Sequence, residues 1–398
     1  MDINSKHPEK KSGSLTAWVA GFLAVLISYA GPLVIYIQAA QAGNISSAEL
    51  TSWIWAISIG AGVSGLLLSW WLKLPIITAW SAPGTALLLS LFPSITMPEV
   101  VGAYLVAAVA VIIIGVSGWF ERIVNFIPRG IAAGMMVGIL FQFGVQAFRA
   151  SMELPVAVFA MLAAYLLARR LLPRYAVVLT LAVGVAWAAL DGQMRWSAVH
   201  FALATPVFTA PSFSLSALMS LALPLFIVTM ASQNLPGVAV MRATGYQLPV
   251  SRLISMIGLA TLVLAPFGGF ALNFSAITAA ICMGPEAHPD PARRYTAAAS
   301  CGLLYIAVGI FGAVVTGLLT AFPPELVVAI AGLALLGAIG GGLASALADE
   351  GHREPALITF LVTLSGVSLA GIGSAFWGVV AGSAALFVQQ YGRRRAHR

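Results

Sequence analysis

The chain has 398 residues, of which 60% are hydrophobic and only 8% are charged. Soluble domains of this length do not have such a composition, and apolar runs of about 20 residues recur throughout, so the sequence predicts a polytopic membrane protein. The net charge of +7 does not indicate nucleic-acid binding, because the basic residues lie in short loops between the apolar runs. At roughly 25 residues for each span and its turn, the chain has room for about fourteen spans.

The chain begins with a polar tail, residues 1–14, that lacks the pattern of a cleavable signal peptide. A first span is predicted over residues 15–40. It contains a break at Gly31-Pro32. Gln38 lies near its end and is a weaker candidate for a binding site, with a solvated side chain as its other interpretation. A second span follows over residues 51–72.

The third apolar segment, residues 74–87, cannot be a plain membrane helix. Pro75, Pro83 and Gly84 interrupt it, and backbone without helical hydrogen bonds survives at membrane depth only inside protein or beside a cavity. We expect a short extended piece and then a half-helix that begins near Pro83, with Ser81 as its N-cap. The half-helix would direct the partial positive charge of its N-terminal amides at the middle of the protein, which favours an anionic group. A kinked but continuous helix is the alternative.

Spans four to seven complete the first half of the chain. They are predicted over residues 99–120, 130–148, from there to 168, and from there to 190. The fifth span has glycines at four-residue spacing, Gly130, Gly134 and Gly138, which lets another helix backbone approach closely. The longer polar connection Asp191–Pro211 then marks the midpoint.

The second half has the same character as the first. An eighth span, residues 215–244, contains Pro236-Gly237, which corresponds to the Gly31-Pro32 break. A ninth span covers residues 253–265. The tenth is broken like the third, because residues 265–278 are apolar, are interrupted by Pro and Gly, and have small polar residues where a half-helix would begin.

Four further spans are predicted after the broken tenth. The eleventh reaches Phe322. The twelfth contains glycines that predict another close helix contact, namely Gly332, Gly337 and Gly340 to Gly342. Two last spans precede a basic tail, residues 392–398.

These correspondences predict two inverted seven-span repeats, residues 15–205 and 206–391. An odd number of spans in each repeat turns the second one over, and paired broken segments in two such halves point to the binding site of a transporter. All Lys and Arg residues except Arg149 and Arg195 then fall on the side of the N-terminus. The positive-inside rule therefore places both termini in the cytoplasm.

Four stretches carry a resemblance to a known family: Ser28–Pro32, Ile77–Gly84, Ser232–Gly237 and Phe267–Asn273. With the seven-plus-seven arrangement, they resemble the bacterial benzoate/proton symporter family, within the uracil-permease and sulfate-permease architecture, over nearly the whole chain. The resemblance implies an all-α integral protein of the bacterial inner membrane that imports an aromatic carboxylate with protons. It also implies a core domain (spans one to four and eight to eleven) that moves against a gate domain (spans five to seven and twelve to fourteen), and a homodimer formed through the gate domain.

The substrate site is expected where spans one, three, eight and ten meet. Amides of the two half-helices would bind a carboxylate, and aromatic rings would flank the substrate. The candidate residues are Tyr29, Trp80, Ser81, Ala82, Pro83, Gly84, Thr85, Ser232, Gln233, Asn234, Asn273, Phe274 and Ser275. Each also has a purely structural interpretation, since buried amides join helices and aromatic rings pack in membrane protein cores. No cofactor, metal site or catalytic motif is predicted, so we do not expect an enzyme.

No acidic or basic side chain lies clearly inside a predicted span, which argues against a charge-pair relay for a coupling proton. Nucleobase transporters of this architecture place acidic residues in spans eight and ten, where this chain has Ser232 to Asn234 and Asn273 to Ser275. An anionic substrate explains the difference, because a buried carboxylate would repel it. Glu286, His288 and Asp290 are the candidates for proton coupling, and a solvated loop is their other interpretation. A substrate that carries its own proton, an uncoupled anion pathway and a nucleobase-type transporter are the alternatives.

Overall fold

The computed structural model describes residues 9–30, 32–92, 94–122, 128–199, 201–269 and 271–390. This part of the chain is mostly helical, with two strands of three residues each. In chain order its α-helices and strands are α1 (Glu9–Ala30), α2 (Pro32–Ala42), α3 (Ser47–Leu72), β1 (Thr78–Trp80), α4 (Ala82–Leu91), α5 (Met97–Ser117), α7 (Arg129–Arg149), α8 (Pro155–Leu171), α9 (Ala176–Leu190), α10 (Leu215–Ala217), α11 (Leu223–Val228), α12 (Leu235–Ala243), α13 (Val250–Leu264), β2 (Leu272–Phe274), α14 (Ala276–Met283), α15 (Tyr295–Ile310), α16 (Gly312–Thr320), α17 (Pro324–Leu347), α18 (Arg353–Leu364) and α19 (Ser374–Gln390).

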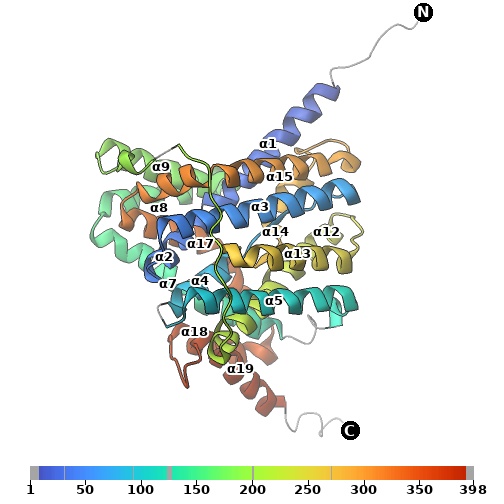
Figure 1. Cartoon of the computed structure of the whole chain (residues 1–398), viewed down its shortest axis with the longest axis vertical. Helices are drawn as coiled ribbons and strands as arrows, with labels where there is room; N and C mark the ends of the chain where they lie inside the picture. Colours follow the sequence, from blue (N-terminus) through green and yellow to red (C-terminus); the bar gives the residue numbers. More distant parts are fainter. Residues whose placement is uncertain are drawn as a thin grey trace, which may run out of the picture.

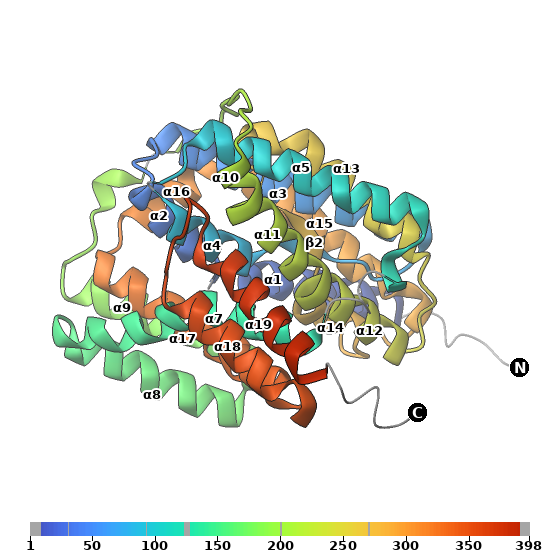
Figure 2. The same ribbon diagram turned by 90° about the horizontal axis from the view of Figure 1, so that it is seen from below.

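The helices pack in two groups. In one, α15, α3, α13 and α5 lie side by side in a layer, with α1 against α15 (Figure 1). We call this group, α1–α5 and α10–α16, the α3 group. In the other, α7 packs against α17, α18 and α19, and α8 packs against α9 (Figure 2). We call this second group, α7–α9 and α17–α19, the α7 group.

The two groups meet along a limited set of helices. α2 contacts α17, α4 contacts α7, and α1 contacts α9. The eighth span also joins the groups, because α11 contacts both α7 and α19.

Six helical stretches of the described residues are long and apolar enough to cross a membrane. They are Ser47–Leu72, Met97–Ser117, Arg129–Met152, Leu215–Ala243, Val250–Phe267 and Pro324–Leu347. A seventh candidate is a pair of helices bent by 75° between Ile310 and Gly312. The predicted eleventh span does not run straight to Phe322, because the backbone leaves the helical conformation at Phe311, just before α16 begins at Gly312.

The eighth span differs from its prediction. Helical structure runs from Leu215 to Ala243 and includes two π-helical turns, η4 (Leu218–Ala222) and η5 (Thr229–Asn234). A π turn is wider than an α turn, so the ring of Pro236, which follows η5, fits without ending the helix. The predicted break at Pro236-Gly237 is therefore wrong. Of its predicted counterpart, Gly31 lies outside the described residues, between α1 and α2.

The glycine contacts predicted in the fifth and twelfth spans have different outcomes. On α7, an added Cβ at Gly134 would lie 2.5 Å from the carbonyl oxygen of Ala356, and one at Gly138 would lie 2.6 Å from Thr363 Cβ, so α18 does pack closely there. On α17, Gly332 and Gly342 pack against α7. Gly340 and Gly341 face open space, so the predicted close contact there is wrong for the described residues.

Candidate functional site

Two short strands bring the third and tenth segments together. β1 and β2 pair antiparallel, with Thr78 opposite Phe274, Ala79 opposite Asn273 and Trp80 opposite Leu272. The hydroxyl of Thr78 donates to the carbonyl of Ala61 on α3 at 2.7 Å, which fastens the ribbon to the α3 layer. Because the strands are antiparallel and each leads into a helix, α4 and α14 begin at opposite ends of this short ribbon.

The first of these N-termini, at α4, is closed by its own residues. Ser81 is the N-cap, and its Oγ accepts a hydrogen bond from the N–H of Gly84 at 3.1 Å. Pro83 has no N–H. The hydroxyl of Thr85 donates to the Ser81 carbonyl at 3.1 Å, and both Ser81 and Thr85 are fully buried. Among the first three residues of α4, only Ala82 therefore has an N–H group that does not bond to the Ser81 side chain.

The second N-terminus, at α14, has no such cap. The Oγ of Ser275 accepts from the hydroxyl of Thr278 at 2.6 Å, and no side chain of the described residues caps the backbone N–H groups of the first turn. These N–H groups of Ala276 to Thr278 carry the partial positive charge of a helix start. α14 therefore offers the more open anion-binding end of the two.

Asn234 and Phe274 connect the eighth span to β2. Asn234 is fully buried, and its Oδ1 accepts a hydrogen bond from the N–H of Phe274 at 2.7 Å. The ring of Phe274 lies against Gly237, where an added Cβ would come within 2.5 Å of it. Both residues thus have a packing role. Ser232 and Gln233, on the same π turn as Asn234, are half-buried.

A cluster of three aromatic rings surrounds the end of β1. Trp80 lies 4.9 Å from Tyr29, and Tyr305 lies 5.7 Å from Trp80 and 5.8 Å from Tyr29, between ring centroids. The Tyr29 hydroxyl is 2.5 Å from Ser58 Oγ, and the Tyr305 hydroxyl donates to Ser28 Oγ at 2.5 Å. Sequence reasoning missed Tyr305, because no motif marks this tyrosine within an apolar segment of α15.

Two buried side chains at the strand pair keep an N–H group without a partner. The indole Nε1 of Trp80 and the amide Nδ2 of Asn273 have no hydrogen-bond partner among the described residues, although Trp80 is 5% exposed and Asn273 is 1% exposed. Buried polar groups are almost always hydrogen-bonded, so such atoms are candidate positions for a ligand or an ordered water. Both unpartnered groups are donors. Asn273 pairs with Ala79 and Trp80 pairs with Leu272, so the two side chains leave opposite faces of the strand pair.

The candidates for proton coupling lie at the other end of α14. Glu286 is exposed and lines a cavity of about 760 Å³. His288 and Asp290 stabilise a turn, because His288 Nδ1 accepts from the Asp290 N–H at 3.0 Å and Asp290 caps the N–H of Ala292 at 2.9 Å. The eight residues of α14 separate all three from β2.

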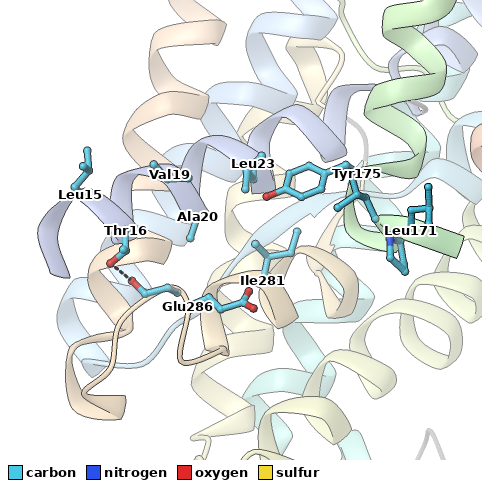
Figure 3. A pocket seen from close by; sticks show the side chains of 12 residues that line it. Leu15, Thr16, Val19, Ala20, Leu23, Leu171, Tyr175, Ile281 and Glu286 are labelled. Carbon is cyan, nitrogen blue, oxygen red and sulfur yellow. Dashed lines mark hydrogen bonds between the residues drawn. The ribbon is translucent and has the colours of Figure 1, made fainter. Parts of the chain in front are cut away.

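The cavity itself lies between the two helix groups. Figure 3 shows Leu23 of α1 and Ile281 of α14 on one wall, with Tyr175 and Leu171 at the end of α8 and the turn after it on the other. The hydroxyl of Thr16 donates to the carbonyl of Ala287 at 3.1 Å, which ties the loop after α14 to α1. Within the described part of the chain, no group of three or more His, Cys, Asp or Glu side chains lies close enough to hold a metal ion.

Comparison with known proteins identifies close relatives. A family model described as "Benzoate membrane transport protein" matches residues 11–388. A "Benzoate membrane transport protein" of Acinetobacter baylyi is 47% identical over 379 residues, which are 95% of this chain and 96% of that protein. "Inner membrane protein YdcO" of Escherichia coli is 44% identical over 364 residues, 92% of this chain and 93% of that one.

Solved structures show the same fold at low sequence identity. The structure of SLC26A9 matches 94% of this chain with a TM-score of 0.62 and 12% identity, and this chain spans 65% of its length. The transmembrane domain of the cyanobacterial bicarbonate transporter BicA matches 98% of this chain and 99% of its own, with a TM-score of 0.55 and 15% identity. Since the family model covers nearly the whole sequence and both relatives align almost end to end, the chain belongs to the benzoate membrane transport protein family, whose members are multi-pass membrane transporters and not enzymes.

Proposed function

We propose that this protein imports benzoate or a related aromatic carboxylate across the bacterial inner membrane, by proton symport with alternating access. The proposal depends on one observation: the buried side-chain atoms without a hydrogen-bond partner at the strand pair are N–H donors. Asn273 Nδ2, close to the uncapped start of α14, is a donor, and a carboxylate is purely an acceptor. The relative from Acinetobacter baylyi, a benzoate transport protein by name, supports the choice of substrate.

The carboxylate is assigned to the α14 side of the site. The uncapped N–H groups at the start of α14 and the Asn273 amide supply several donors, and hydrogen bonds to an ionised acceptor are about twice as strong as neutral ones. The aromatic cluster of Tyr29, Trp80 and Tyr305 supplies the apolar surface for the ring of the substrate.

Alternating access requires two bodies that separate first on one side of the membrane and then on the other. We assign the α3 group as the core domain and the α7 group as the gate domain, with fourteen spans in two inverted repeats and with β1–α4 and β2–α14 as broken spans. The cavity between α1, α14 and α8 supports an inward-open state, because the positive-inside rule puts this end in the cytoplasm. Both termini are then cytoplasmic.

A nucleobase fits this site less well. Its ring N–H groups need acceptors, and the best-placed buried acceptor, Asn234 Oδ1, already binds the N–H of Phe274. An uncoupled anion pathway is the second candidate, because the strand pair and the turn η5 contain no acidic residue to carry a proton.

Uptake of labelled benzoate into proteoliposomes tests the proposal. We expect protein-dependent uptake that an inward proton gradient accelerates and a protonophore abolishes. Liposomes without protein are the control, since neutral benzoic acid crosses bilayers unaided. Protein-dependent uptake that ignores the gradient would favour the uncoupled pathway, and an absence of protein-dependent uptake would refute benzoate as substrate.

A further inference from the structure

Gln38 has a buried side-chain amide without a hydrogen-bond partner among the described residues. The side chain is 9% exposed, and neither its Nε2 nor its Oε1 has a hydrogen-bond partner among the described residues. The interpretation of Gln38 as a solvated side chain is therefore wrong. Folded proteins rarely leave both ends of a buried amide unpaired, so a group that is present in another state or with a ligand must pair with it.

Gln38 lies on a helix that joins the two groups. α2 packs against α4 on one side and contacts α17 of the α7 group. Tyr36, two residues earlier, lies beside Thr85 of α4, and two residues turn a helix by about 200°, so Gln38 is on the side of α2 away from α4. The cavity opens at the opposite end of the same span, along Leu15 to Leu23 of α1. Gln38 therefore lies on the helix that joins the two groups, at the end of the span away from the cavity.

The two unpaired atoms of Gln38 are a donor and an acceptor side by side. An ionised carboxylate matches only the donor, whereas a protonated carboxyl group offers one O–H donor and one C=O acceptor and matches both. We propose that Gln38 binds the neutral acid form of the substrate on its way in, so that the coupling proton crosses as the substrate's own carboxyl proton. The acid O–H donates to Oε1 and Nε2–H donates to the acid carbonyl. The acid then ionises at the start of α14, where the carboxylate is bound, and its proton is released on the cytoplasmic side. This inference rests on the proposed substrate class.

The surroundings of Gln38 offer no better proton carrier. Among the side chains that the structure describes, the titratable groups on helices packed against α2 are Tyr29 of α1, Glu49 of α3 and Glu325 of α17, beside Tyr36 of α2 itself. Tyr104 of α5 also interacts with Tyr36. Glu49 accepts hydrogen bonds from its own capping residue, Ser46. Glu325 lies in the first turn of α17 and is the carboxylate to exclude by substitution.

The test compares Gln38→Met with Gln41→Met. Both glutamines are on α2, but Gln41 is exposed, so the second variant controls for the substitution itself. Aromatic acids ionise near the range of side-chain carboxyls, about pH 4, so acidification raises the fraction of neutral acid. At mildly acidic external pH, we expect the uptake rate of Gln38→Met to be about tenfold lower than that of the wild type. Gln41→Met and Glu325→Gln should have the wild-type rate. Gln38→Met should fold at least as stably as the wild type, because it removes an unpaired buried amide.

Benzamide is the second probe, because it has a donor and an acceptor at every pH. It should inhibit benzoate uptake at neutral pH in the wild type and not in Gln38→Met, whereas methyl benzoate, which lacks the donor, should inhibit neither. Unchanged acid-stimulated uptake in Gln38→Met would overturn the inference and indicate a bound water at Gln38. An absence of uptake by the wild type would instead refute the proposed function.

Discussion

The two strand-and-helix segments, β1–α4 and β2–α14, have similar sequences and the same secondary structure but differently finished helix ends. Both give a three-residue strand followed by a short helix with a serine just before it. In the first, Ser81 caps the helix and Pro83 removes one N–H. In the second, Ser275 forms no cap and the first-turn N–H groups stay available.

This difference assigns unequal roles to two halves that look symmetric. At the start of α4, the Gly84 N–H is used in the Ser81 cap, whereas the first-turn N–H groups of α14 have no capping side chain. Close to the start of α14, Asn273 also has an amide N–H without a partner among the described residues. A repeat-built transporter can therefore place its anion site on one side of its pseudo-symmetry axis. The predictions below test this inequality.

The largest expected effect is at Asn273. Asn273→Leu should reduce benzoate uptake to background while the protein stays folded, because its Nδ2 has no partner to lose among the described residues. Uptake into proteoliposomes and the thermal melting curve of the same preparation measure the two quantities.

Asn234 provides the matched contrast to Asn273. Asn234→Leu leaves the Phe274 N–H buried without its acceptor and should lower the free energy of unfolding by about 1–3 kcal/mol. If Asn273→Leu destabilised the protein as much as Asn234→Leu, Asn273 would be a structural residue and not a substrate ligand.

Trp80→Phe should have a smaller effect on transport. It keeps an aromatic ring in the cluster with Tyr29 and Tyr305 but removes the unpartnered indole N–H. The indole N–H lies on the face of the strand pair opposite to Asn273, so it does not bind the carboxylate there. We expect a rise of about threefold in the KM for benzoate, as for the loss of one neutral hydrogen bond, with uptake at saturation little changed. An unaltered KM would show that the indole N–H does not contact the substrate.

Ser81→Ala and Ser275→Ala compare the two helix ends directly. Ser81→Ala should cost about 1 kcal/mol of stability through the lost cap, with little change in substrate affinity. Ser275→Ala should cost less stability, because its Oγ accepts only from the Thr278 hydroxyl. Chemical or thermal denaturation measures the two losses of stability. A larger loss in Ser275→Ala than in Ser81→Ala would show that Ser275, and not Ser81, is the stronger cap.

The smallest effect is expected far from both ends, in the loop before α18. The hydrogen bond from His352 and that from the Gly351 N–H hold the pKa of Asp349 below its usual range. Stabilisation by this carboxylate is therefore present at neutral pH and is lost as the pH falls through the lowered pKa. In Asp349→Asn, the melting temperature should fall slightly less than in the wild type as the pH is lowered, and benzoate uptake should be unchanged. A transport defect would contradict a purely local role.

The sequence predicted the strand-then-helix course of both segments and the Ser81 cap, because Pro83, Gly84 and the small polar residues limit what the backbone can do. It did not predict the π turn before Pro236, since a proline alone does not tell a break from a widened turn. It also missed Tyr305 and the burial of Gln38, because both depend on which helix face meets which neighbour in the fold. The membership of the family was recognisable from its motifs.

The most direct test of the account is a structure of the protein with 4-iodobenzoate bound, in which the anomalous signal of iodine locates the ring. The account predicts the carboxylate at the start of α14, within hydrogen-bond distance of Asn273 Nδ2, and the ring toward Tyr29 and Trp80. A carboxylate bound at the capped start of α4, or in the cavity beside Glu286, would contradict it.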